Sequence, residues 1–228
     1  MSRAIRTNTR RQLTGQTLVG CALAVAVMSG PAAAHEDEVL GKVHFANSCS
    51  AGVQESFDRA VALQHSFWYQ AAYKTFDEVL AADPTCAIAH WGKAMTLLFN
   101  PFNQPPAKNL ADGAAEIAAG HNPAAKTARE RDFIDAVGAF YTDADKLDHR
   151  TRVAAYLKAM EALATKYSDD SEARIFYALA LDEAVDLKDK TYSRQLKAGA
   201  MLEQWNSRHR KAAAQTGQRR ATFREISV

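Results

Sequence analysis

Histidine side chains are the first candidates for chemistry in this chain of 228 residues. Neutral imidazole binds zinc, copper and iron. His65 and His90 lie on neighbouring predicted helices, and His44 precedes the first of them, so the three could come close together. Their spacing matches no helical metal motif such as H-E-x-x-H, and a histidine in an aromatic-rich helical core is more commonly a hydrogen-bonded packing residue. These residues support only an alternative hypothesis, a metal-binding protein or metal-dependent enzyme.

A second candidate site is the aromatic cluster Phe67, Trp68, Tyr69 and Tyr73, which is richer in rings than a helical hairpin needs. We expect most of these rings to pack in the core and some to line a peptide or ligand groove, as in helical scaffolds. The chain has no G-x-S-x-G motif, no credible Cys–His pair and no glycine-rich phosphate loop. The sequence therefore favours a non-catalytic protein without a cofactor, which binds a protein or peptide.

Apolar residues recur at helical spacing along most of the chain, and no stretch alternates as a strand would. Phe57 and Leu63 share one face of the first predicted helix. Pro84 ends the second, because proline lacks an N–H donor and disfavours helical angles in its neighbour. Thr127 and Glu130 form a capping box that opens another helix. The prediction is an all-α fold of about eight antiparallel helices. The expected ranges are 51–66, 69–82, 86–98, 107–119, one helix beginning at 127, 149–166, 171–185 and one beginning near 189.

The first two predicted helices carry the pattern of a tetratricopeptide (TPR) repeat. Counting back from Pro84, Ala60 and Ala72 fall where the repeat has small residues, and Phe76 falls where it has an aromatic residue. A second copy, ending near Ser168, is degenerate. We therefore expect an irregular TPR-like α-solenoid and not a regular tandem array.

Short motifs characteristic of one family are distributed over roughly residues 40–203. They are His44-Phe45, Ser48-Cys49, His65-Ser66-Phe67, Asp83-Pro84, Cys86-Ala87, Trp91-Gly92-Lys93-Ala94-Met95, Arg129-Glu130-Arg131, Asp148-His149-Arg150, Ile175-Phe176-Tyr177-Ala178-Leu179-Ala180-Leu181 and Lys190-Thr191-Tyr192. In these motifs the chain resembles exported bacterial TPR proteins of unassigned function. The resemblance implies an α-solenoid, with further helical repeats after the equivalent of the eighth helix.

Two cysteines are placed so that they could form a disulfide. Cys49 precedes the first predicted helix and Cys86 opens the third. In an antiparallel helix stack these two ends lie on the same side. We expect a bridge between them if the chain is exported to an oxidising compartment; two separate buried thiols are the alternative.

Residues 1–34 have the composition of an export signal. Four arginines precede the apolar run 18–28, and small residues end at Ala34, after which we expect cleavage. Lipid modification of Cys21 and an uncleaved membrane anchor are the alternatives, although the apolar run is shorter than the roughly 20 residues of a membrane span. The expected location is periplasmic or secreted, with no membrane span after cleavage.

The remaining chain divides by composition into an arm at 35–50, a helical domain at 51–204 and a basic tail at 205–228. Helical periodicity stops at the tail, which we expect to be disordered; an out-of-frame ending of a longer protein is the sharper hypothesis. The helical domain itself is net acidic, so no nucleic-acid partner is expected. The favoured function is a protein-binding or peptide-binding scaffold, and a non-functional truncated product is a further alternative.

Overall fold

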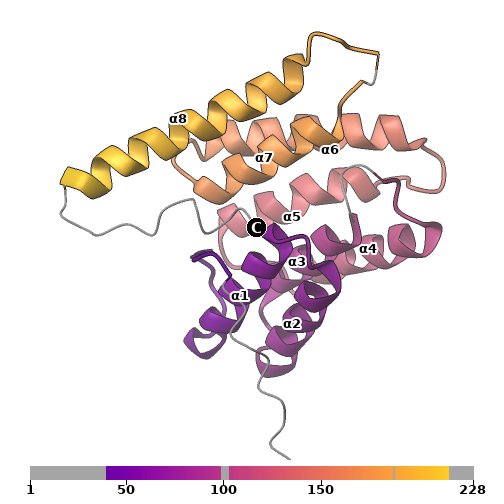
Figure 1. Cartoon of the computed structure of the whole chain (residues 1–228). Helices are drawn as coiled ribbons and strands as arrows, with labels where there is room; N and C mark the ends of the chain where they lie inside the picture. The colour runs from indigo at the N-terminus through magenta and orange to yellow at the C-terminus, as the bar shows by residue number, and fades with distance from the viewer. Residues whose placement is uncertain (1–39, 99–102, 187, 216–228) are drawn as a thin grey trace, which may run out of the picture. The chain divides into compact units, whose positions relative to one another are not determined.

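The computed structural model describes residues 40–98, 103–186 and 188–215, all within the second of the chain's two units, Val39–Val228 (Figure 1). These residues confirm the predicted all-α class: they form eight α-helices and one 3-10 turn, and no strand. The turn is η1 (Ala51–Val53); the helices are α1 (Gln54–His65), α2 (Tyr69–Ala82), α3 (Ala87–Leu98), α4 (Ala107–Gly120), α5 (Ala128–Tyr141), α6 (His149–Lys166), α7 (Ser171–Glu183) and α8 (Ser193–Gln215). None of the described helices is long and apolar enough to cross a membrane.

Side-chain caps define the start of three helices. At α5 the Thr127 hydroxyl accepts a hydrogen bond from the Glu130 backbone N–H, and the Glu130 carboxylate accepts one from the Thr127 backbone N–H. This is the capping box that the sequence predicts. The carboxylates of Asp148 and Asp170 cap α6 and α7, where negative charge also favours the helix dipole. The caps satisfy N–H groups that have no partner within the helix.

Consecutive helices pack on one another in chain order, and α3 also contacts α1 and α5. Glycines allow two of these contacts to be close. A Cβ built on Gly92 of α3 would lie 2.2 Å from the Phe76 ring of α2, and one on Gly113 of α4 would lie 2.2 Å from the Tyr141 ring of α5. The rings occupy the space that the glycines leave, which gives the interior its close packing.

A chain of aromatic rings joins the odd-numbered helices. The Phe45 ring lies 5.4 Å from that of Phe57 in α1, 4.9 Å from Trp91 in α3 and 5.2 Å from Phe133 in α5. Trp91 in turn lies 5.1 Å from Phe176 in α7. All five rings are at most 1 % exposed, so α1, α3, α5 and α7 share one core with the arm residue Phe45.

The seventh helix contacts the first directly. The His65 Nε2 atom at the end of α1 lies 2.8 Å from the Glu172 Oε2 atom in α7, and the His65 ring stacks on the Phe176 ring with centroids 5.0 Å apart. Two helices that are distant in the sequence therefore meet through these side chains, and the candidate site described below lies next to this contact.

The N-terminal arm is attached by covalent and polar contacts. The predicted disulfide between Cys49 and Cys86 is confirmed. Next to it, the Ser48 backbone N–H and hydroxyl each donate a hydrogen bond of 2.6 Å to the Glu130 carboxylate. The same carboxylate thus caps α5 and holds the arm, which explains why Glu130 is only 1 % exposed.

Of two boundaries expected from the sequence, one lies outside the described residues and the other lies within a described helix. The expected signal segment 1–34, with its cleavage site and Cys21, lies outside the described residues. The expected domain end at 204 falls within α8, which continues to Gln215, and the Arg174 guanidinium lies 4.8 Å from the Trp205 ring. Alanine, arginine, lysine and glutamine have high helix propensity, so a helix can continue there without an apolar stripe.

Candidate functional site

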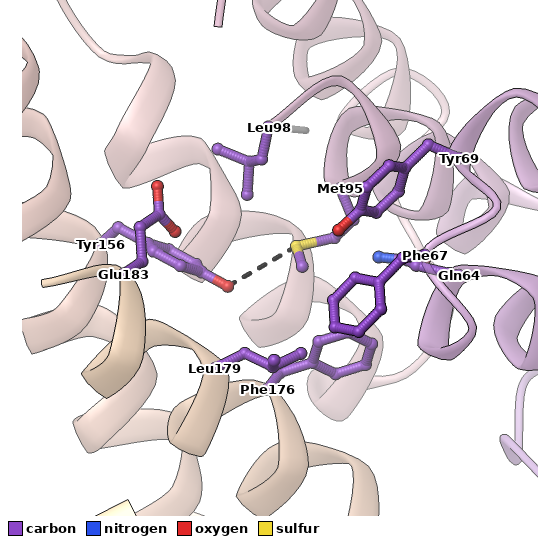
Figure 2. A pocket seen from close by; sticks show the side chains of 9 residues that line it. All are labelled: Gln64, Phe67, Tyr69, Met95, Leu98, Tyr156, Phe176, Leu179 and Glu183. Carbon is purple, nitrogen blue, oxygen red and sulfur yellow. Dashed lines mark hydrogen bonds between the residues drawn. The ribbon is translucent and has the colours of Figure 1, made fainter. Parts of the chain in front are cut away.

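A small pocket lies where the C-terminal ends of α1, α3 and α7 meet α6 and the α1–α2 turn (Figure 2). Its volume is about 30 Å³, which is space for about two water molecules, and it is partly open to the surface. Most of the lining is apolar or aromatic, with few polar groups, as is usual for binding pockets. The lining residues are Gln64, Phe67, Tyr69, Met95, Leu98, Tyr156, Phe176, Leu179 and Glu183.

The turn after α1 places the Phe67 ring at this pocket in a strained backbone conformation. The Phe67 N–H donates to the Gln64 carbonyl and the Trp68 N–H to the Leu63 carbonyl, each at 3.0 Å. This is the Schellman helix ending, whose left-handed position is usually glycine. Here that position is Phe67, with φ 60°, and a residue with a Cβ costs about 1–2 kcal/mol in this conformation. The phenylalanine is 52 % exposed, so burial of its ring offsets only part of that cost.

Gln64 and Glu183 each lack a compensating interaction in the pocket. Gln64 is 5 % exposed, and its side-chain oxygen has no hydrogen-bond partner in the described part of the chain. Glu183 lies at the end of α7, and burial raises the pKa of its carboxyl from 4.5 to about 7. No hydrogen bond or positive charge from the described residues offsets that burial. Glu183 is only partly exposed, and a carboxylate with little water around it and no partner is costly in its charged form, which is why its pKa lies near neutrality.

The negative charge of this carboxyl acts on tyrosines from three helices. Burial and, after it, the negative charge of Glu183 together raise the pKa of Tyr69 to about 12. The pKa values of Tyr141 and Tyr156 are raised by the same two causes in the same order. The Tyr156 hydroxyl points at the Met95 sulfur, 3.7 Å away (Figure 2). The phenols therefore stay neutral, and Glu183 is the only group here that titrates near pH 7.

No protein-family model, curated protein or solved structure matches this chain. The resemblance to exported TPR proteins consequently stays an expectation drawn from its motifs. Function has to be argued from the pocket itself: its size, its aromatic lining and its unpaired polar groups.

The predicted aromatic cluster divides between the pocket and its surroundings. Phe67 and Tyr69 line the pocket, and Trp68 lies between them in the turn with 45 % of its surface exposed. Tyr73 lies one turn further along α2, and its hydroxyl donates to Glu116 of α4 at 3.2 Å. Two of the four residues thus lie at the pocket, a third is exposed beside it, and the fourth belongs to a polar network.

The three candidate metal-binding histidines each pair with a different carboxylate. The Nδ1 atom of His44 lies 3.1 Å from Asp58 Oδ2, and that of His90 lies 2.7 Å from Glu116 Oε2. His65 pairs with an α7 carboxylate, as described above. The described residues contain no group of three or more histidine, cysteine, aspartate or glutamate side chains that could hold a metal ion. The structure does not bring the three histidines together.

Lys93 lies at the centre of a polar network whose members do not line the pocket. Lys93 is 8 % exposed and donates to Asp77 at 2.8 Å and to Glu116 at 2.6 Å. Burial alone would lower the pKa of Lys93, but these hydrogen bonds raise it above its ordinary value. His90 and Tyr73 complete the cluster. Every charge in it faces an opposite charge, so the network joins α2, α3 and α4 and leaves no group for a ligand.

Sequence reasoning missed the residues that complete the pocket. Met95, Tyr156, Phe176 and Leu179 lie on apolar faces of their helices, and neither they nor Gln64 and Glu183 are among the site residues that the sequence predicts. One signal was present: Glu183 follows Phe176 by seven residues, or about two turns, so an acidic residue falls on a buried apolar face.

Proposed function

We propose that this chain is an exported, TPR-like helical scaffold that binds a segment of a partner polypeptide at the pocket around Phe67. The observation that carries the proposal is the strained turn after α1. It presents two aromatic rings, Phe67 at 52 % and Trp68 at 45 % exposure, beside an apolar pocket. Aromatic anchors next to small, well-formed pockets are typical centres of protein interfaces.

Backbone strain at this place supports a role in binding over one in folding. A glycine would complete the same helix ending without the cost of the left-handed conformation. A bulky residue in this region is rare and tends to occur at functional sites. The ring is only half buried in the free chain, so most of the benefit from its hydrophobic surface becomes available when a partner covers it.

The TPR-like part of the proposal is supported by the order and closeness of helix packing. Consecutive helices contact one another, and each of α1 and α5 contacts α3, as in arrays of helical hairpins. Ala60, Ala72 and Ala94 are 0 % exposed, and Gly92 lies against Phe76, so small residues occur at the close helix contacts of α1, α2 and α3.

Export is supported by the disulfide. Structural disulfides persist in oxidising compartments and are rare in the cytosol. The Cys49–Cys86 bridge joins the arm to the start of α3, and both cysteines contact the main core. Together with the signal-like composition of residues 1–34, this favours a periplasmic or secreted chain.

The proposal can be tested by selecting peptides on the purified chain. Random twelve-residue peptides displayed on phage are selected against the immobilised protein, and synthetic copies are titrated by fluorescence anisotropy. We expect enriched peptides to lose at least about tenfold in affinity for Phe67→Gly, because loss of an aromatic anchor costs about 2 kcal/mol or more.

Tyr192→Gly is a closely matched control. Tyr192 is also aromatic, 57 % exposed and in the left-handed conformation with φ 54°, but it does not line the pocket. We expect peptides to bind this variant as they bind the parent chain. Selection that enriches no peptide, or equal losses in the Phe67 and Tyr192 variants, would refute the proposed function.

A further inference from the structure

Two acceptor groups of the pocket, on Gln64 and Glu183, receive no hydrogen bond or positive charge from the described residues. An ionised Glu183 accepts only, and the Gln64 side-chain oxygen is buried without a donor. No lysine, arginine or histidine is among the lining residues. The pocket therefore lacks a positively charged donor, and a ligand that brings one would satisfy groups which the folded chain leaves unpaired.

No positively charged group on a neighbouring helix is among the causes that shift the pKa of Glu183. Tyr69 of α2, Tyr141 of α5 and Tyr156 of α6 are the groups whose pKa its charge raises, and all three are neutral. Arg152 of α6 acts on Tyr141 but is not among the causes that shift Glu183. Arg152 is itself buried, with its Nε and Nη2 atoms unpaired in the described part of the chain, but it does not line the pocket. The charge of Lys93 is already paired with two carboxylates.

The aromatic lining of the pocket also favours a cationic ligand, independently of the carboxylate. Phe67, Tyr69, Tyr156 and Phe176 all line the pocket (Figure 2). The faces of aromatic rings attract cations, and cages of such rings bind ammonium groups. An anionic ligand would be repelled by both the rings and Glu183, and a neutral apolar ligand would leave the carboxylate buried and unpaired.

The size of the pocket decides which cation fits. A volume of about 30 Å³ holds a compact ammonium group and not a whole metabolite. An ammonium on a long flexible stem is the lysine side chain, whereas the arginine head is a larger planar fork. The pocket is partly open and its lining residue Phe67 is half exposed, so the stem can enter from outside while the rest of the ligand stays on the surface.

We propose that the pocket binds the ammonium group of a lysine side chain from the partner polypeptide, with Glu183 as its counter-ion and the Phe67 and Tyr69 rings beside its stem. This inference rests on the proposed function, because it specifies what part of the partner enters the pocket. Binding pairs the carboxylate, so affinity falls when Glu183 takes up a proton.

The test uses two small probes that differ only in the charged group. Nα-acetyl-lysine methylamide and Nα-acetyl-norleucine methylamide are titrated into the chain carrying ¹³C-methyl methionine, and NMR follows the Met95 methyl signal, assigned with Met95→Leu. We expect saturable shifts with the lysine probe, and at least about tenfold weaker binding of the norleucine probe. Affinity for the lysine probe should fall about tenfold between pH 8 and pH 6, because the carboxyl of Glu183 has a pKa of about 7.

Glu183→Gln should abolish both the preference for lysine and its pH dependence. Glu78→Gln, a change at an exposed glutamate of α2, should alter neither. Equal binding of the two probes, or an unchanged lysine preference in Glu183→Gln that is folded by circular dichroism, would overturn the inference. Selected peptides that depend on Phe67 but not on lysine would overturn it while the proposed function stands. A lysine-specific shift without any selected peptide would refute the proposed function alone.

Discussion

Glu183 should lower the stability of the folded chain at neutral and alkaline pH. Burial raises the pKa of its carboxyl from 4.5 to about 7, and each tenfold change in proton affinity corresponds to about 1.4 kcal/mol. The folded chain holds this proton more tightly than the unfolded chain. Its contribution to stability is therefore full below pH 4.5, declines between pH 4.5 and 7, and is absent above pH 7, a total of about 3 kcal/mol.

Glu183→Gln removes this titration while keeping the size of the side chain. We expect the variant and the parent to have similar free energies of unfolding at pH 4, and the variant to be more stable by about 3 kcal/mol at pH 8. For a domain of this size that corresponds to about 6–12 °C in melting temperature. Other titrating groups are common to both proteins, so the difference between the two curves isolates Glu183.

Urea unfolding followed by circular dichroism at pH 4, 5, 6, 7 and 8 provides the measurement, with the disulfide kept oxidised. Glu78→Gln is the control, because an exposed side chain without special contacts should change stability by less than about 0.5 kcal/mol at every pH. A stability difference that does not vary with pH would refute the reasoning. A variant that is less stable than the parent at pH 8 would show that the carboxylate has a stabilising partner.

Two further predictions concern backbone conformation and close packing. Phe67→Gly should be more stable than Phe67→Ala by about 1 kcal/mol in thermal unfolding, since both lose the ring and only alanine keeps the left-handed strain; equal stabilities would contradict strain at φ 60°. Gly92→Ala should destabilise the chain by about 1–3 kcal/mol, because its Cβ would lie 2.2 Å from the Phe76 ring. Gly199→Ala in α8, whose Cβ would meet nothing within 4 Å, should instead stabilise it by up to about 1 kcal/mol.

Local patterns in the sequence were sufficient to predict the elements of the fold. The capping box at Thr127 and the break at Pro84 depend on residues a few positions apart, and both are where the pattern predicts them. The Cys49–Cys86 bridge was predictable for a similar reason, because antiparallel hairpins bring alternate helix ends to one side. In each case the physical cause acts within one hairpin.

The pocket was not predictable by the same means, because it depends on where α7 returns to α1. Gln64 and Glu183 belong to helices separated by more than a hundred positions in the sequence. Helical periodicity identifies the buried face of each helix but not the helix that covers it. The aromatic cluster at Phe67 drew attention to the correct turn, while its partners from α6 and α7 could only be seen in three dimensions.

Other buried carboxylates and a buried lysine in the described part of the chain have hydrogen-bond or ion-pair partners, and this contrast makes Glu183 informative. Lys93 has two carboxylate partners, Glu172 pairs with His65, and Glu130 accepts hydrogen bonds from the arm and the helix cap. Arg152 is less completely paired, since its Nε and Nη2 atoms have no hydrogen-bond partner among the described residues. Among the carboxylates, Glu183 is the exception, because burial alone raises its pKa. The exception coincides with a second cost, the left-handed conformation of Phe67, in the same pocket. Two independent destabilising features at one partly open site are explained together if a ligand relieves the first and covers the ring exposed by the second.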